Sequence, residues 1–303
     1  MHLWRIIKLN YLRVLTNKGI TILQSVQDYI SDYFTKNNEH LSKFYPGITS
    51  SRLLLAFSDT CKVVGSDTYL GQGFEFFKDL ERGKPLEYID HNAYFYRSNF
   101  YVDKRVLIPR SETEILVGDA LNIVKKNYHE EYSIAEVGVG SFAIGLSLLM
   151  DFDKKINLWG GDISLDALKV AEINLFRHQS RLHPEASVII EKSDRFEKLN
   201  HKVDLIITNP PYIKVSAGKV GVHIQAEIYE PKIALYLEDG EYDLWYDDFF
   251  RDGSLKLREK GLFLMEGHED CLLDLKEIAI KYFNHVEIKN DYTGRQRFLH
   301  ASL

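Results

Sequence analysis

The sequence predicts an α/β protein in which a small all-α domain precedes a doubly wound, mostly parallel sheet of seven strands. Two observations carry this prediction. Before residue 87 the apolar residues recur only at helical spacing. From residue 130 onward, short apolar runs of strand length alternate with helical segments, which is typical of a doubly wound sheet. The expected strands are 132–135, 156–161, 188–190, 203–208, 262–265, 286–289 and 297–301.

The composition is that of an ordinary globular protein. The chain is 45% hydrophobic and 27% charged, and its formal net charge is −6, so no stable nucleic-acid binding is expected. Cys61 and Cys271 are far apart and form no CxxC pair, which argues against a disulfide framework and fits the cytoplasm. No His, Asp and Glu cluster shows ligand spacing, so no metal is expected. No apolar run reaches the roughly 18 residues that a membrane-spanning helix needs.

The amino-terminal part is expected to be helical. Residues 1–19 carry four lysines and arginines and no acidic residue, and we interpret them as a basic leader or an extra helix. Residues 20–86 form the small helical domain. Its helices are expected from Ile22, near 52–63 and near 72–82, and Gly83-Lys84-Pro85 ends the last of them.

Residues 87–109 change character and predict a β-hairpin that links the helical domain to the sheet. They are rich in aromatic and β-branched residues, and Arg97-Ser98-Asn99 is the candidate turn. The sheet domain then covers residues 110–303. It begins with a helix for which Ser111 and Glu114 are expected to form a capping box.

A glycine-containing turn follows the first expected strand of the sheet. Its residues are Glu136-Val137-Gly138-Val139-Gly140-Ser141-Phe142, and a helical run begins at Ala143. An acidic residue followed by Gly-x-Gly between a strand and a helix lets the backbone approach a nucleoside-bearing ligand closely. The next strand ends at Asp162, where a carboxylate can accept hydrogen bonds from ribose hydroxyls. Ser193-Asp194 ends the strand after that.

The most informative stretch is Asn209-Pro210-Pro211-Tyr212, at the carboxyl end of the strand expected at 203–208. Ligands of open α/β sheets bind at this edge, although an isolated Asn-Pro-Pro is also a common turn. The Asn209 side chain and the Asn209-Pro210 backbone offer carbonyl oxygens that could accept both N–H bonds of a planar amide or aryl amine. Tyr212 could cover the flat face of that group. Holding both hydrogens directs the nitrogen lone pair at an electrophilic methyl group, and such positioning can supply about 7–11 kcal/mol of a barrier.

Together these motifs resemble the protein-(glutamine) methyltransferases that modify peptide chain release factors. The resemblance begins near residue 20 and continues to the end of the chain. Its most specific part is Leu-Ile-Pro-Arg-x-Glu-Thr-Glu at 107–114, and Gly-Lys-Pro-Leu-Glu-Tyr-Ile at 83–89 and Glu230-Pro231 add to it. The Asn-Pro-Pro-Tyr sequence alone is shared with adenine amino-methyltransferases.

The resemblance implies a Rossmann-like methyltransferase sheet that binds S-adenosylmethionine, and a helical domain that helps to recognise the release factor. The target is the glutamine of the Gly-Gly-Gln loop in class 1 factors. Carried over by motif, Asn209, Pro210 and Tyr212 act on the glutamine amide as catalytic residues, and Pro211 completes the substrate site. The implied donor-binding residues are Glu136, Gly138, Val139, Gly140, Ser141, Phe142, Asp162, Asp194, Arg195 and Asn209.

Two positions depart from the family pattern. The third glycine of the donor loop is Phe142 here, so its ring either enters the donor site or packs against the helix. Arg195 stands where the family often has an aromatic residue against adenine, and its guanidinium plane can stack instead. Two alternatives therefore stay open: an adenine-N6 nucleic-acid methyltransferase with the same acceptor geometry, and an inactive relative in which Phe142 blocks the donor and the chain acts as a binding module.

Overall fold

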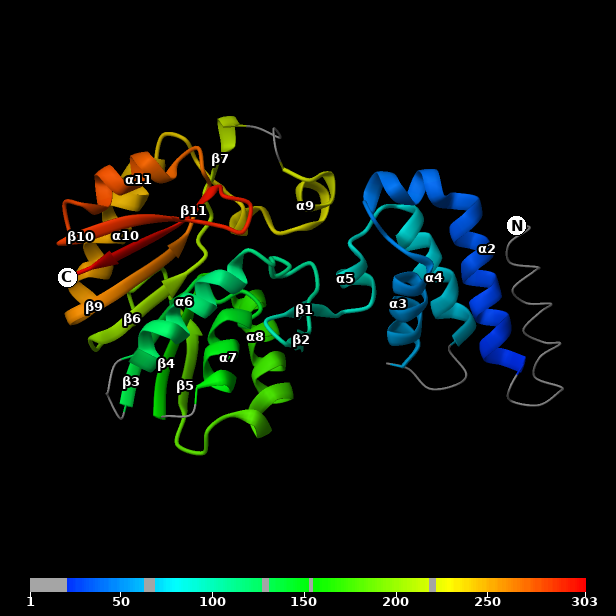
Figure 1. Ribbon diagram of the computed structural model, residues 1–303, viewed down its shortest axis with the longest axis horizontal. Coiled ribbons are helices and arrows are strands. Elements are labelled where there is room, and N and C mark those ends of the chain that lie inside the picture. Colours follow the sequence, from blue (N-terminus) through cyan, green and yellow to red (C-terminus); the bar gives the residue numbers. More distant parts are fainter. Residues whose placement is uncertain (1–20, 63–68, 127–130, 153–154, 218–221) are drawn as a thin grey trace. The chain divides into compact units, whose positions relative to one another are not determined.

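The computed structural model describes residues 21–62, 69–126, 131–152, 155–217 and 222–303 (Figure 1). The basic leader expected at 1–19 lies outside these residues. The chain divides into two compact units, Met1–His91 with His223–Tyr229, and Asn92–Val222 with Glu230–Leu303. No helix among the described residues is both long and apolar enough to cross a membrane.

The first unit consists of helices. Apolar side chains of its three longer helices form the core, in which the rings of Phe57 and Phe76 meet edge to face at 5.3 Å between centroids. Leu41, Leu53 and Leu80 are fully buried around them. The helices are α2 (Thr21–Phe44), α3 (Ser50–Lys62), α4 (Tyr69–Glu81), α5 (Leu86–Ile89) and α9 (Ile224–Tyr229).

Helix α9 is distant in sequence from the rest of this unit and is held to it by two side chains. Gln225 Nε2 donates to the Gly83 carbonyl at 2.9 Å, and the Tyr229 hydroxyl donates to the Arg82 carbonyl at 2.8 Å. Both carbonyls lie just beyond the carboxyl end of α4, where backbone acceptors lack helical partners. The sequence at 214–227 shows no clear periodicity, so α9 was not predicted.

Helix α5 corrects the expected start of the β-hairpin. Tyr88 and Ile89 are predicted in the hairpin but lie in α5, and both are buried. Their backbone N–H groups donate to the Pro85 carbonyl at 3.0 and 3.1 Å. Pro85 is the N-cap residue, and its carbonyl accepts the first hydrogen bonds of the helix, so this aromatic segment begins with a helical turn.

The second unit contains a seven-stranded sheet in the order β10-β11-β9-β6-β3-β4-β5, which confirms the predicted fold class. The five strands from β9 to β5 are parallel, and β11 is antiparallel to both of its neighbours. The strands are β3 (Glu131–Val137), β4 (Lys155–Asp162), β5 (Ser187–Lys192), β6 (Val203–Thr208), β9 (Leu257–Glu266), β10 (His285–Asn290) and β11 (Gln296–Ser302).

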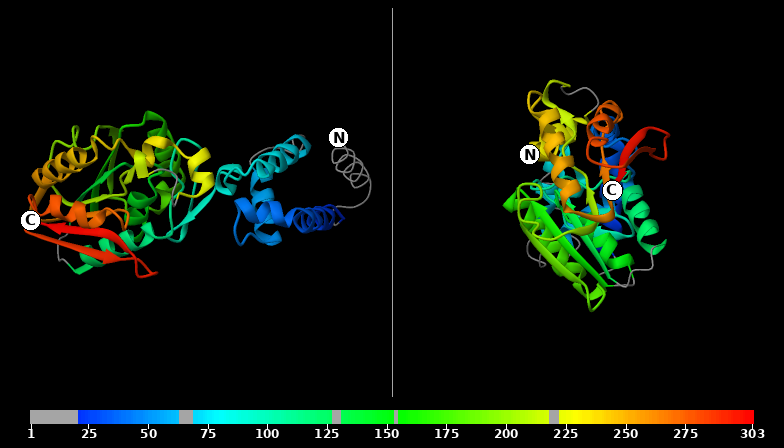
Figure 2. Two further views of the ribbon diagram at one scale, coloured as in Figure 1. Left: turned by 90° about the horizontal axis from the view of Figure 1, so that it is seen from above. Right: turned by 90° about the vertical axis from the view of Figure 1, so that its left-hand side faces the viewer.

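Helices cover both faces of this sheet (Figures 1 and 2). On β6, Leu205 and Ile207 pack into the core under α6 to α8, whereas Ile206 packs into the core under α10 and α11. Because both faces are buried, the strand is a continuous apolar run instead of an alternating one. The helices are α6 (Thr113–Lys126), α7 (Ala143–Asp151) and α8 (Leu165–His178) on one face, and α10 (Tyr242–Lys256) and α11 (Leu272–Ala279) on the other.

A short hairpin, β1 (Ala93–Phe95) and β2 (Ser98–Phe100), precedes the sheet. Its turn is formed by Tyr96 and Arg97, both with positive φ, and lies one residue earlier than predicted. Phe95 and Phe100 belong to the core under α6 to α8.

The junction between α10 and β9 also differs from the prediction. Helix α10 ends at Lys256 instead of 260, because Leu257 is buried and pairs with Val203 on β6. Residues 258–260 then form an exposed bulge before Leu262 pairs with Leu205, and alternating charges there had extended the helical pattern.

The expected capping box is absent from the start of α6. The Ser111 hydroxyl donates to the Glu112 carboxylate at 3.0 Å, and the helix begins only at Thr113.

Candidate active site

A pocket of about 230 Å³ opens in the sheet unit, at the carboxyl ends of β3, β4 and β6. Of the residues predicted to bind the donor, Phe142 is the exception that does not line it. Pro210 and Pro211 line the pocket, whereas Tyr212 does not. The predicted donor residues that line it are Glu136, Gly138, Val139, Gly140, Ser141, Asp162, Asp194, Arg195 and Asn209.

The loop between β3 and α7 is shaped by two glycines. Gly138 and Gly140 have φ values of +72° and +53°, a backbone conformation that residues other than glycine rarely adopt. The Gly138 N–H donates to the Gly161 carbonyl at 2.9 Å, and the Gly140 N–H donates to Asp162 Oδ2 at 2.9 Å. The loop is therefore fastened to the end of β4, with its backbone facing the pocket.

Asp162 joins this loop to the start of α8. Its second oxygen, Oδ1, accepts from the Ser164 N–H at 2.8 Å. Burial raises the pKa of Asp162, and the two backbone hydrogen bonds counter that effect. Because each carboxylate oxygen can accept more than one hydrogen bond, the oriented group retains capacity for ligand hydroxyls.

Phe142 packs into the protein core. Its ring is fully buried in the core under α6 to α8, and its φ is +65°. An added Cβ at Gly145 would lie 2.3 Å from the Phe142 ring, so this glycine in the first turn of α7 makes room for it. A left-handed backbone at a phenylalanine costs about 1–2 kcal/mol, which the packing of the ring offsets.

Glu136 holds the start of α7 through a hydrogen bond to its backbone. It is buried, and its Oε2 accepts from the Gly145 N–H at 2.9 Å, in the first turn of that helix. Burial raises the pKa of Glu136 well above its ordinary value, and the nearby Asp162 raises it further. One of its oxygens is thus committed to the helix start.

The far end of the pocket combines a guanidinium and an indole. Arg195 Nε lies 3.5 Å from Asp194 Oδ1, and its Nη1 lies 3.8 Å from Asp248 Oδ2. The Arg195 guanidinium carbon is 5.8 Å from the centre of the Trp245 ring, a cation–π distance. Trp245 lines the pocket from α10 and was not predicted as a site residue.

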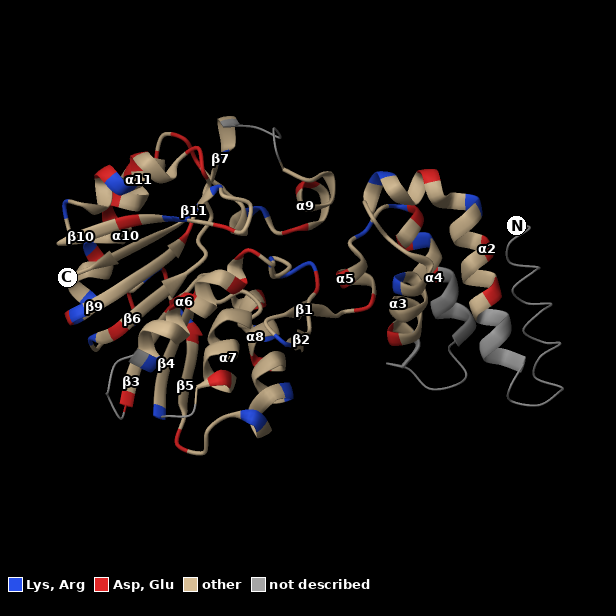
Figure 3. Ribbon diagram, viewed as in Figure 1, with Lys and Arg blue, Asp and Glu red and all other residues tan. Residues whose placement is uncertain are grey.

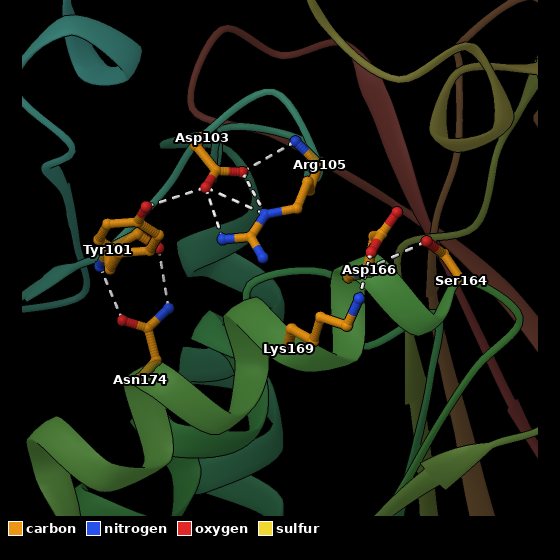
Figure 4. A network of polar contacts seen from close by, with 8 residues as sticks. Tyr101, Asp103, Arg105, Ser164, Asp166, Lys169 and Asn174 are labelled. Carbon is orange, nitrogen blue, oxygen red and sulfur yellow. Dashed lines mark hydrogen bonds and ion pairs between the residues drawn. The ribbon is translucent and has the colours of Figure 1, made fainter.

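Asn174 of α8 joins the donor loop to the segment after the hairpin, whose Tyr101 faces it in Figure 4. Its Oδ1 accepts from the Tyr101 N–H at 2.7 Å, and its Nδ2 donates to the carbonyls of Tyr101 and Ser141, both at 2.9 Å. Beyond Tyr101, Arg105 forms a bidentate pair with Asp103 and also lines the pocket. Burial raises the pKa of Asp103, but hydrogen bonds from Arg105 and Tyr101 outweigh this and lower it to about 2.

Asn209 lies at the carboxyl end of β6 and is held by a chain of two further groups. Asn209 Nδ2 lies 3.3 Å from Thr113 Oγ1, and the Thr113 hydroxyl donates to Glu266 Oε2 at 2.5 Å. Thr113 and Glu266 are buried. Burial raises the pKa of Glu266 to about 7, although Thr113 and Arg297 act in the opposite direction.

Two tyrosines hold the backbone that follows Asn209. The Tyr246 hydroxyl donates to the Pro211 carbonyl at 3.0 Å, and the Tyr242 hydroxyl donates to the Tyr212 carbonyl at 3.1 Å. Both tyrosines are buried on one face of α10. Within the described residues, no hydrogen bond engages the Pro210 carbonyl, so this carbonyl is available to a ligand in the pocket.

The Tyr212 side chain lies beside the pocket lining, among charged groups. Its ring centre is 6.3 Å from that of His268, and burial raises the pKa of its hydroxyl, with the Glu266 charge adding to the effect. Its role in stacking on the substrate amide stays a prediction.

Arg110 and Glu230, from two of the quoted motifs, form an ion pair at 2.6 Å. Glu230 is buried and Arg110 lines the pocket. The pair connects the segment before α6 to the segment that ends the Asn-Pro-Pro-Tyr loop.

Sequence reasoning missed the groups that support Asn209. Glu266 directly follows the last residue of the predicted strand 262–265, and a polar residue at that edge of a sheet was a usable signal. Thr113 gave no such signal, since it stands inside a helix start whose polar residues suit capping. Tyr242 and Tyr246 are spaced like ordinary core residues of a helix.

Comparisons with known proteins agree with this geometry. The sequence model of the Methyltransferase small domain matches residues 113–241. The release factor glutamine methyltransferase of Clostridium acetobutylicum is 32% identical, over 94% of this chain and 95% of the relative. That of Leptospira interrogans is 35% identical, over 73% of this chain and 76% of the relative.

A longer relative and a solved structure are also similar. A bifunctional methyltransferase of Rickettsia typhi is 35% identical over 75% of this chain, but the chain spans only 46% of its length. The solved hMettl16 catalytic domain shares the fold, with a TM-score of 0.50 at 17% identity, covering 67% of this chain and 74% of that one. On the identity and coverage of its release-factor relatives, the chain belongs to the release factor glutamine methyltransferase family, and its cofactor is S-adenosylmethionine.

Proposed function

We propose that this protein transfers a methyl group from S-adenosylmethionine to the side-chain amide nitrogen of the glutamine in the Gly-Gly-Gln loop of class 1 peptide chain release factors. The observation that carries the proposal is the position of Asn209 and Pro210 at the pocket, with Asn209 Nδ2 already engaged by Thr113. The names of the similar release-factor enzymes support the choice of acceptor.

The pocket residues suit the groups of the donor. Asp162 is oriented by two backbone N–H groups and can accept from ribose hydroxyls. Gly138 and Gly140 place bare backbone against the pocket, and Trp245 with Arg195 offers flat surfaces for a purine. When bound, the donor supplies a methyl group on a positively charged sulfur.

For the acceptor, the proposal assigns two carbonyl oxygens to the two amide hydrogens of glutamine. Asn209 Oδ1 and the Pro210 carbonyl each accept one N–H, so the nitrogen lone pair points toward the methyl group. Their positions are fixed before the substrate binds, by Thr113 on the side chain and by Tyr246 on the next carbonyl. Fixed acceptors of this kind lower the barrier through orientation.

Two alternatives remain as outcomes of the tests. Burial of the Phe142 ring away from the pocket lining removes the sequence-based reason to expect an inactive relative. An adenine-N6 enzyme would favour a basic groove for nucleic acid, yet acidic and basic residues are interspersed over the described elements (Figure 3).

We also propose separate roles for three segments of the chain. Residues 20–86 help to recognise the release factor, 87–109 link the two parts, and 110–303 bind the donor and carry out methyl transfer in the cytoplasm.

The test is a methyl-transfer assay with labelled S-adenosylmethionine and a release factor in wild-type and Gln→Ala loop forms, with duplex DNA and RNA alongside. Label on the wild-type factor alone is expected. Asn209→Ala should lower kcat by at least about 100-fold and leave donor binding, measured by calorimetry, nearly unchanged. Asn284→Ala, an exposed Asn in the same unit, is the matched control.

Label on nucleic acid would favour the adenine enzyme. Donor binding without transfer to any acceptor would contradict the proposed substrate, and the absence of donor binding would favour the inactive relative. Normal turnover by Asn209→Ala would refute the role of its side chain.

A further inference from the structure

The hydrogen bonds that link Asn209, Thr113 and Glu266 run in one direction, with Asn209 donating to Thr113 and Thr113 donating to Glu266. The three residues come from different segments: the end of β6, the first residue of α6 and the last residue of β9. The contact between Thr113 Oγ1 and Glu266 Oε2 is short, at 2.5 Å, as expected for a hydroxyl that donates to a carboxylate. Both groups are buried, so water does not substitute for either partner.

The direction follows from counting donors and acceptors. An ionised Glu266 carboxylate can only accept, so the single hydroxyl hydrogen of Thr113 goes to it. The Thr113 oxygen then has only lone pairs left for Asn209. An amide facing that oxygen must present its NH₂ group, which leaves Oδ1 as the free acceptor. Among the described residues, no group donates to Asn209 Oδ1.

We propose that Thr113 and Glu266 are positioning residues that fix the polarity of the Asn209 amide, so that its oxygen and not its nitrogen faces the substrate. The inference rests on the proposed function, since the polarity matters only if the acceptor donates two N–H bonds. An Asn209 amide rotated by 180° would present a donor to a donor, and the substrate amide would not be held.

Protonation of Glu266 removes the constraint. A protonated carboxyl can donate to Thr113 Oγ1, which frees the Thr113 hydrogen to donate to Asn209 and favours the reversed amide. Burial holds the pKa of Glu266 near 7, so this change falls close to neutral pH. The titratable and charged groups that face Glu266 are Arg110 and Glu112 before α6, Arg297 on β11 and Tyr212 after β6.

The first experiment compares Thr113→Val, Thr113→Ser and wild type in the methyl-transfer assay. Valine keeps the shape without the hydroxyl, so kcat should fall at least about tenfold while the donor Kd stays within about twofold. Serine should restore kcat. Thr293→Val is the matched control, because Thr293 also donates to a carboxylate, Asp291 at 2.6 Å, in the β10–β11 turn.

The second experiment is the pH profile of Glu266→Gln. The wild-type kcat should fall as pH decreases through about 7. Glutamine does not titrate, so the variant should have a lower kcat at pH 8 and no acid limb. A wild-type limb retained in Glu266→Gln would overturn the proposal.

A third measurement does not depend on activity. In protein labelled with ¹⁵N-asparagine, the side-chain NH₂ resonance of Asn209, assigned through Asn209→Ala, should shift with a midpoint near pH 7 and lose that shift in Glu266→Gln. If the NH₂ signal of Asn209 in the wild type does not change with pH, the coupling of Asn209 to Glu266 through Thr113 is refuted, whatever the enzyme methylates. Equal kcat in Thr113→Val and Thr293→Val refutes it while leaving the proposed function standing, provided that wild type methylates the factor.

Discussion

Replacing Glu266 by Gln should stabilise the folded protein at pH 8 far more than at pH 5. Burial raises the pKa of Glu266 from 4.5 to about 7 in the folded protein. The unfolded chain therefore releases this proton at a lower pH than the folded chain does. The free energy of unfolding therefore falls as pH rises. Relative to low pH, where Glu266 is protonated in both states, the loss is about 1 kcal/mol at pH 5 and about 3 kcal/mol at pH 8. Glutamine is neutral throughout and avoids this penalty.

Urea unfolding at pH 5 and pH 8, followed by tryptophan fluorescence, measures the effect. Trp159 and Trp245 lie in the same unit as Glu266 and report on its unfolding. The stability gain of Glu266→Gln over wild type should increase by about 2 kcal/mol between the two pH values. Glu259→Gln, which removes an exposed carboxyl from the β9 bulge, is the control. An equal gain at both pH values would refute the reasoning, because it would mean that Glu266 titrates alike in both states.

Three further substitutions test other parts of the site. Phe142→Ala should lower the unfolding free energy by about 3–5 kcal/mol, measured in urea, with donor affinity within several-fold of wild type; lost affinity at unchanged stability would place the ring in the donor site after all. Asn174→Leu removes three hydrogen bonds and leaves the Ser141 carbonyl unpaired, so it should cost about 2–4 kcal/mol in the same assay and weaken donor binding; wild-type stability would contradict this. Tyr246→Phe releases the Pro211 carbonyl and should lower kcat without changing the donor Kd in calorimetry, whereas unchanged kcat would show that the loop is held without it.

Much of the fold could be predicted because local patterns decide the elements. The bounds of β6 match the prediction, since a run buried on both faces ends at prolines that cannot join a ladder. The end of α10 could not be predicted in the same way. Charged residues at 258–260 are compatible with an exposed helix face or an exposed bulge, and only the pairing of Leu257 with Val203 decides between them.

The candidate site divides along the same line. Gly138, Gly140, Asp162 and Asn209 lie at or within three residues of the carboxyl ends of strands. Parallel strands bring such positions to one edge of the sheet, so their proximity was predictable. Thr113 and Glu266 approach Asn209 only because β9 is the neighbour of β6 and α6 begins beside them. Strand order is a property of the whole domain, and no local pattern in the sequence specifies it.

The supports of the Asn209 loop also differ in what they contribute to stability. Tyr242 and Tyr246 bury large rings and satisfy two carbonyls, so they stabilise the fold and the loop together. Glu266 does the opposite at neutral pH, because a buried carboxyl near its pKa opposes folding. A protein with glutamine at position 266 would fold more readily, and the glutamine oxygen would still accept a hydrogen bond from Thr113. However, the glutamine would not exclude the reversed Asn209 amide, because its own NH₂ group can donate to Thr113 and free the Thr113 hydrogen for Asn209. On the proposed polarity of Asn209, an ionised carboxylate at this position opposes folding but imposes a single direction on the Asn209 amide.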